Sequence, residues 1–199
     1  MNRREALERV ALLMGGVISA PTITAFLEGC TPGSQSESAL FTGFTDQQLQ
    51  LVAEIAETII PATDTPGAKD ANVAEFIQLM LKDCYYPKDQ KSFLAGLKSI
   101  SDKGFLDATA DKRIQLLTEA EEESFQYKDE VAKKRKEAAD ANQTFDEPGV
   151  HFFSLMKELT LLGYFTSEVG ATQALDYLPV PGRYEGCVPL TPEQKTWAL

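Results

Sequence analysis

Residues 152–163 read FFSLMKELTLLG, the most apolar helical stretch in the sequence after its opening segment. Large apolar side chains recur in it at helical spacing and are not confined to one narrow stripe, which predicts a helix surrounded by other helices. Pro148 and Gly149 precede the stretch, and Gly163 is placed to cap its C-terminal end. We therefore expect the central helix of a bundle. Its apolar residues are Phe152, Phe153, Leu155, Met156, Leu159, Leu161 and Leu162.

Working outward, a first helix is predicted far upstream. Residues 45–48 read TDQQ, a capping box in which the Thr45 side chain accepts from the backbone of Gln48 while the Gln48 side chain reaches back. Apolar residues then follow at helical spacing as far as Ile60. Pro61 stops the helix, because the residue before a proline disfavours helical geometry.

Three more helices are predicted between these two. One begins at Val73 and fades at Tyr85, and the next begins near Pro87 and closes at Gly104. The last begins near Thr109 and continues into a charged run over 119–140, which indicates a solvated helix or a mobile arm. The sequence therefore predicts an all-α fold: one bundle of about five helices.

The C-terminal residues 164–199 show no periodicity and form an extended tail rich in aromatic residues and proline. Such a tail either wraps its own bundle or docks on a partner, with side chains filling pockets. Five helices already supply a core, so we expect the aromatic residues to contact a partner. They are Tyr164, Phe165, Tyr177, Tyr184 and Trp197.

The chain opens with a basic start at Arg3 and Arg4 and an uncharged, mildly apolar stretch over 10–27. This pattern predicts a signal peptide over 1–29, and the paired arginines favour the twin-arginine pathway over an ordinary secretory signal with a chance pair. Cys30 ends a lipobox-like LEGC, so lipidation there is expected, although Glu28 departs from the usual pattern. Residues 30–43 are predicted to be a flexible tether, followed by a helical domain over 44–199.

Composition excludes several classes of partner. The net charge of −11 repels nucleic acid and anionic lipid. Cys84 and Cys187 remain after Cys30, and in an exported protein an even pair suggests a disulfide, the alternative being two separate thiols in the core.

The sequence carries no motif for catalysis. His151 stands alone at the start of an apolar helix, where a histidine is usually a capping or core residue. Asp70 and Glu75 are expected on a solvated face. Because HExxH, CxxC, GxGxxG, P-loop and GxSxG patterns are all missing, we expect no catalytic, cofactor-binding or metal-binding residue in this chain.

The leader and two runs, residues 44–81 and 152–190, together resemble the gluconate 2-dehydrogenase subunit 3 family. The most recognisable pieces are AETIIPATDTPGA and LTLLGYFTSEVG. The resemblance implies the small, non-catalytic gamma subunit of a periplasmic or membrane-associated sugar or sugar-acid dehydrogenase. The catalytic partner would be a large flavoprotein of the glucose-methanol-choline type that holds FAD, and a cytochrome c subunit is a further expected partner.

The resemblance also implies a reason for the leader. A flavin is inserted in the cytoplasm, so a complex assembled there needs a pathway for folded cargo, and the small subunit supplies the signal. The expected location is the periplasm or cell envelope, with membrane association through a lipid anchor or through the partner. The alternative is a self-standing helical envelope lipoprotein that binds a ligand or scaffolds a complex.

Overall fold

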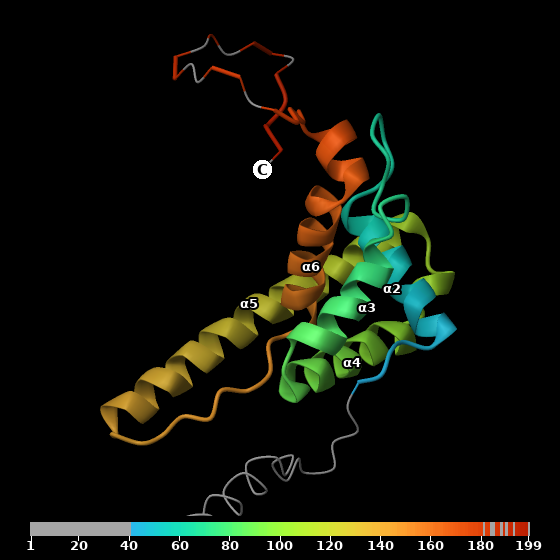
Figure 1. The fold of residues 1–199 in the computed structure, drawn as a ribbon. Helices are drawn as coiled ribbons and strands as arrows, with labels where there is room; N and C mark the ends of the chain where they lie inside the picture. The colour runs from blue at the N-terminus through green and yellow to red at the C-terminus, as the bar shows by residue number, and fades with distance from the viewer. Residues whose placement is uncertain are drawn as a thin grey trace, which may run out of the picture. The chain divides into compact units, whose positions relative to one another are not determined.

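The computed structural model describes residues 41–180, 182–183, 186–187, 189, 191–192 and 194–198. In this part of the chain the structure is helical, and the predicted all-α bundle of about five helices is confirmed (Figure 1). The elements are α2 (Asp46–Ile59), α3 (Val73–Cys84), α4 (Pro87–Asp102), the 3₁₀ turn η1 (Phe105–Asp107), α5 (Ala110–Asp140), α6 (Phe152–Thr166) and the π-helical turn η2 (Gly170–Ala174). The predicted leader over 1–29 lies outside the described residues.

The helices begin where the sequence provides side-chain caps. Thr45 and Gln48 form the predicted capping box, with N–O distances of 3.0 and 3.3 Å. Thr109 accepts from the backbone of Lys112 at the start of α5. His151 caps α6, its Nδ1 accepting from the backbone N–H of Phe153 at 3.2 Å. The interpretation of His151 as a capping residue is confirmed.

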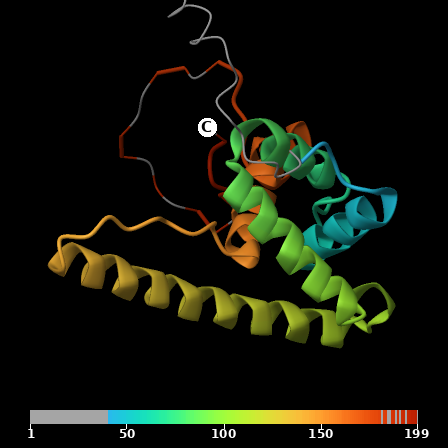
Figure 2. The same cartoon turned by 90° about the horizontal axis from the view of Figure 1, so that it is seen from below.

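Helix α6 is the centre of the bundle, and it contacts α2, α3, α4 and α5 (Figures 1 and 2). One side of α6 is buried along its length by the four other helices, and the opposite side, which carries Lys157 and Glu158, faces solvent. The buried residues are Phe152, Phe153, Leu155, Met156, Leu159, Thr160, Gly163 and Tyr164. The apolar stretch therefore forms the central helix of the bundle, as predicted.

Two glycines let α6 approach its neighbours closely. A Cβ on Gly96 of α4 would lie 2.1 Å from the Cβ of Phe152, and one on Gly163 would lie 2.6 Å from the ring of Phe76 in α3. Both distances are far below any van der Waals contact, so no larger residue fits at either crossing. The prediction that Gly163 caps α6 is wrong: the helix continues to Thr166, and Gly163 is a crossing point within it.

Two adjacent polar residues near the start of α4 bind distant segments. Gln90 donates to the carbonyls of Leu81 and Tyr85 and accepts from the backbone of Phe41, while Asp89 accepts from the backbone of Val150 at 2.8 Å. Both are buried, so satisfying these backbone groups avoids a desolvation cost.

The helical domain begins earlier than predicted. Phe41, assigned to the tether on sequence grounds, is 8% exposed and packs edge-on against Phe44.

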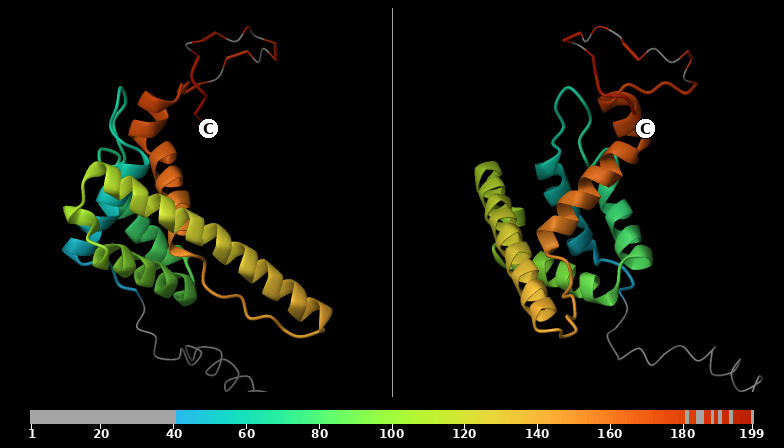
Figure 3. Two further views of the ribbon diagram at one scale, coloured as in Figure 1. Left: turned by 180° about the vertical axis from the view of Figure 1, so that it is seen from behind. Right: turned by 90° about the vertical axis from the view of Figure 1, so that its left-hand side faces the viewer.

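Helix α5 has 31 residues, and its second half extends past the other helices with segment 141–151 returning beside it (Figures 1 and 3). The return is held by the Tyr127 hydroxyl, which donates to the carbonyl of Gly149 at 2.7 Å, and by an Arg135–Glu147 ion pair. The charged run was predicted to be either a solvated helix or a mobile arm. In the structure it is a solvated helix.

Candidate docking surface

The C-terminal end of α6 is built by a tight turn. The Ser167 hydroxyl donates to the carbonyl of Tyr164 at 2.6 Å and accepts from the backbone of Gly170 at 2.9 Å. A Cβ on Gly170 would lie 1.9 Å from the Tyr164 carbonyl oxygen, so only glycine permits this approach. The chain is thereby folded back into η2 directly above the last turn of α6.

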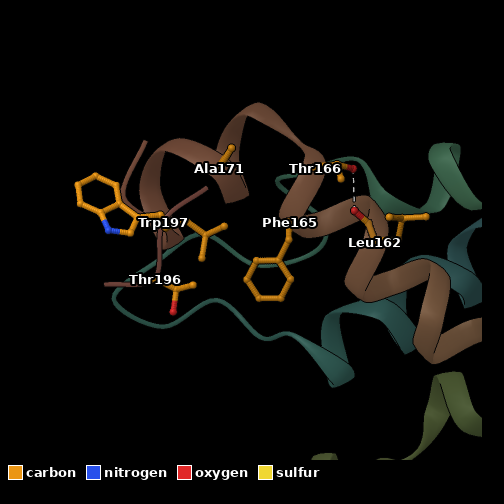
Figure 4. A pocket seen from close by; sticks show the side chains of 7 residues that line it. Leu162, Phe165, Thr166, Ala171, Thr196 and Trp197 are labelled. Carbon is orange, nitrogen blue, oxygen red and sulfur yellow. Dashed lines mark hydrogen bonds between the residues drawn. The ribbon is translucent and has the colours of Figure 1, made fainter. Parts of the chain in front are cut away.

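An apolar groove of about 660 Å³ lies between α6, η2 and the end of the tail (Figure 4). Trp197 and Leu162 stand on opposite sides of this groove, with Phe165 between them. The full set of lining residues is Leu162, Phe165, Thr166, Ala171, Leu175, Thr196 and Trp197. An open apolar groove is a site for apolar side chains of a ligand or of another protein.

The tail itself forms one wall of the groove. The backbone of Asp176 donates to Thr196, and that of Ala198 donates to Asp176, each at 2.9 Å, forming an isolated parallel β-bridge. The Lys195 ammonium adds a bond of 2.7 Å to the carbonyl of Gln173. These three bonds join residues 173–176 to residues 195–198 and fix Trp197 at the rim of the groove.

The segment that forms the groove also exposes several large apolar side chains, three of which line the groove itself. Most of the large hydrophobic residues that the described chain leaves in solvent belong to segment 161–197, although α5 and α3 expose a few others. Those of the segment are Leu161, Leu162, Phe165, Tyr177, Leu178, Val180 and Trp197. Leu161 and Leu162 were expected in the core, but they are 39% and 43% exposed because they lie one turn beyond Lys157 and Glu158, on the solvent-facing side of α6.

A structured loop over residues 60–72, here the PGA loop, lies at the same end of α6. The Glu57 carboxylate accepts from the backbone of Ala62 at 3.0 Å and from that of Lys69 at 2.9 Å, which fastens both sides of the loop. A Cβ on Gly67 would meet Glu57 at 2.3 Å, and Asp70 accepts from the backbone of Gly67. The loop is therefore preorganised by the carboxylate of Glu57 in α2 and by its own Asp70, which explains the AETIIPATDTPGA pattern in physical terms.

Tyr164 joins the PGA loop to α6. Its side chain is only 2% exposed, and its hydroxyl donates to the carbonyl of Pro66 at 2.7 Å. The two recognisable sequence runs, which lie about a hundred residues apart, thus meet at one hydrogen bond.

An ionic cluster of Glu54, Lys69 and Arg113 holds the PGA loop against the helices. Glu54 binds Lys69 at 2.6 Å and Arg113 at 2.8 Å, and Arg113 also donates to the carbonyls of Phe105 and Leu106. The hydrogen bond from Lys69 is the main reason that the pKa of Glu54 lies below its usual value, although partial burial opposes the shift. The cluster ties the loop to α5 and η1.

Two of the five predicted interface residues, Phe165 and Trp197, line the groove, and Tyr177 is exposed nearby in sequence. Phe165, Tyr177 and Trp197 are 41%, 54% and 56% exposed. Tyr164 requires a correction, because it is buried and packs within its own subunit. Tyr184 lies outside the described residues, as do the export residues Arg3 and Arg4 and the lipidation residue Cys30.

The two remaining cysteines are free, exposed thiols in the structure. Neither is the core thiol that the alternative interpretation expected. Cys84 ends α3 at the opposite end from the PGA loop, and a bridge needs Cα atoms within about 7 Å. A disulfide between Cys84 and Cys187 stays a prediction, and it would require the tail to take a different path.

No catalytic constellation was found among the described residues. No group of three or more His, Cys, Asp or Glu residues there is placed to hold a metal ion. Within the same part of the chain, no helix is both long and apolar enough to cross a bilayer. Asp70 supports the PGA loop, and Glu75 is exposed on α3.

Several residues that build the surface carried no clear sequence signal. Glu57 and Asp70 look like ordinary surface acids until the loop folds onto them. Gly170 was interpreted as a turn residue, but Ser167, whose hydroxyl joins Tyr164 to Gly170, was not singled out.

Comparison with known proteins gives one match. The sequence model of a family described as gluconate 2-dehydrogenase subunit 3 matches residues 46–182, more than half of the chain. The match spans α2 through η2, including the PGA loop and Tyr164, but stops before Thr196 and Trp197. No curated protein and no solved structure matches the chain.

Proposed function

Because the chain belongs to the gluconate 2-dehydrogenase subunit 3 family, we propose that it is the small, non-catalytic subunit of an FAD-dependent sugar or sugar-acid dehydrogenase. Its partner is a large flavoprotein of the glucose-methanol-choline type, and FAD belongs to that partner. A cytochrome c subunit that accepts the electrons is a further partner of the complex. The small subunit assists assembly and export of the flavoprotein.

The observation that carries this proposal is the uncovered end of α6. Monomeric proteins seldom leave a contiguous cluster of large apolar residues in water, and such a cluster rimmed by polar groups marks an interaction site. Here Leu162, Phe165 and Trp197 line an open groove, and the first two belong to the second sequence run of the family. A subunit whose role is to bind another protein explains both features together.

Preorganisation strengthens the case for a protein partner. The groove is held by backbone bonds at Asp176 and by the Ser167 cap, and the PGA loop is fastened by Glu57. A surface fixed before binding loses less conformational entropy on association, so more of the contact energy appears as affinity.

The leader completes the proposal. Arg3 and Arg4 direct twin-arginine export of the small subunit, and the folded flavoprotein travels with it. The complex then resides in the periplasm or cell envelope, with Cys30 as a lipid anchor. Replacing both arginines by lysine tests this step, since the receptor for this pathway reads the guanidinium pair and not charge alone. The double variant should leave both subunits in the cytoplasm, and normal export of it would contradict the pathway.

Affinity purification of the full-length subunit from its native envelope in mild detergent tests the assembly. The expected eluate contains a large flavoprotein, with flavin absorbance and sugar-dependent dye reduction. Trp197→Ala should lower recovery of the flavoprotein about tenfold or more, as loss of an aromatic anchor does at stable interfaces.

Tyr86→Ala is the matched control. Tyr86 is also an exposed aromatic residue, at 72%, but it precedes α4, away from the groove. This variant should retain the flavoprotein. An eluate with neither flavoprotein nor flavin would contradict the proposed function and favour a self-standing lipoprotein, and sugar oxidation by the purified small subunit alone would contradict a non-catalytic role.

A further inference from the structure

A row of aromatic rings connects the first described residue to the start of α6. Phe41 packs on Phe44 with ring centroids 4.9 Å apart, Phe44 on Phe93 at 5.9 Å, and Phe93 on Phe152 at 5.1 Å. Phe152 is the first residue of α6. Phe41 is therefore linked, through the rings of Phe44 and Phe93, to the N-terminal end of the central helix.

The backbone is fixed at the same place. The N–H of Phe41 donates to the Gln90 side chain at 3.4 Å, and that side chain also donates to the carbonyls of Leu81 and Tyr85. The end of α3 and the start of α4 therefore meet at Phe41, and the row of rings links this point to the start of α6. Whatever path residues 1–40 take, they join the domain at this point.

The groove lies at the other end of the same helix. From Phe152 to Thr166 the axis of α6 rises about 21 Å, at about 1.5 Å per residue. Figures 1 and 3 show the blue start of the domain and the C-terminal tail at opposite ends of α6. The PGA loop, bound through Tyr164, lies at the tail end.

We infer that the subunit has two separate working ends: the N-terminal segment attaches at Phe41, and the catalytic flavoprotein occupies the groove at the opposite end of α6. This inference rests on the proposed function and adds to it that the two attachments lie at opposite ends of the subunit. Export machinery or a lipid anchor engaging residues 1–40 then leaves the flavoprotein surface free. The subunit can therefore bind the flavoprotein and the export machinery at the same time, which export of a folded partner requires.

The chain's own leader is the competing occupant of the groove. Residues 31–40 span at most about 35 Å when fully extended, enough to reach past the length of α6. The breadth of the surface favours the flavoprotein, because exposed large apolar residues extend from Leu161 on α6 to Trp197 in the tail. A single leader segment of modest apolarity does not cover that area.

Site-specific photo-cross-linking in the complete complex tests the inference. A benzophenone amino acid replaces Trp197 at the groove or Tyr86 at the Phe41 end, both exposed aromatic positions. Each variant of the full chain is co-expressed with the flavoprotein, purified from the envelope, irradiated and examined by mass spectrometry. Flavin absorbance before irradiation reports whether the complex has formed.

The expected result is a covalent adduct with the flavoprotein from position 197 and none above background from position 86. An adduct with the flavoprotein from position 86 would overturn the inference, and so would an adduct from position 197 that joins only to residues 1–40. In both cases the flavin absorbance would still support the proposed function. If no flavin is recovered with either variant or with the unmodified chain, the proposed function fails and the inference fails with it.

Discussion

The two halves of α6 both bury one side in the core but differ in the chemistry of the side that faces solvent. Phe152, Leu155 and Met156 are 3%, 1% and 0% exposed, whereas Leu161, Leu162 and Phe165 are 39%, 43% and 41% exposed. Both halves leave one side in solvent: the first half exposes Lys157 and Glu158 there, whereas the second half exposes these apolar residues, although its other side is buried. Apolar residues are usually selected for burial, so the difference indicates which part of the helix serves this fold and which part serves an assembly.

Alanine substitution at one position in each part of α6 should give the largest contrast. Leu159→Ala removes a fully buried side chain and should lower the free energy of unfolding by about 2–5 kcal/mol. Leu162→Ala, at 43% exposure, should change it by less than about 0.5 kcal/mol. Urea denaturation of the purified subunit measures both. Equal losses would mean that the groove end is part of the core in solution.

Gly96→Ala tests the crossing that fixes the first half. Alanine in a helix normally gains up to about 1 kcal/mol over glycine, but here its Cβ would overlap Phe152 next to the backbone. We therefore expect a net loss of about 1–3 kcal/mol, as for overpacked cores. Gly182→Ala, where a Cβ meets nothing within 4 Å, is the control and should be nearly neutral. A stabilised Gly96→Ala variant would contradict the close crossing.

Tyr164→Phe tests the link between α6 and the PGA loop. The substitution keeps the buried ring but leaves the Pro66 carbonyl without its donor, which should cost about 1–2 kcal/mol. Tyr177→Phe removes the hydroxyl of a residue that is 54% exposed and should have no measurable effect. Thermal unfolding by circular dichroism compares the two. Identical midpoints would show that the hydrogen bond contributes nothing in solution.

The smallest effect concerns the cap of α6. Burial lowers the pKa of His151, so the folded protein binds a proton there less readily than the unfolded chain. The stability from the neutral cap is therefore complete above the unfolded pKa of about 6.5 and is lost as the pH falls toward the folded value. His151→Asn keeps a capping oxygen that does not titrate, and it should remove roughly 0.5–1 kcal/mol of the stability change between pH 7.5 and 5.5. An unchanged pH profile in this variant would contradict the role of the cap.

Much of the fold could be predicted because its causes are local. The capping box at Thr45, the stop at Pro61 and the apolar stretch over 152–162 act through neighbouring residues, and each gave the correct helix. Gly163 was misinterpreted because a glycine near a helix end is a cap by local rules, whereas here Phe76, from a distant part of the chain, determines its role.

The docking surface was only partly predictable for the same reason. The aromatic tail indicated an interface, and Phe165 and Trp197 do line the groove. Tyr164 belongs to the same run, but the carbonyl of Pro66, 98 residues away in sequence, places it inside the protein. Burial and partnership depend on contacts that residue type and spacing alone do not specify.

Hydrogen exchange tests the central claim most directly, that the uncovered end of α6 is completed by the catalytic subunit. Amide exchange is compared between the free small subunit and the complex purified from the envelope. The account predicts slower exchange in the complex at residues 161–176 and in the PGA loop, with no change at residues 41–44 and 85–86. Protection confined to residues 41–44 and 85–86, with none at 161–176, would contradict it.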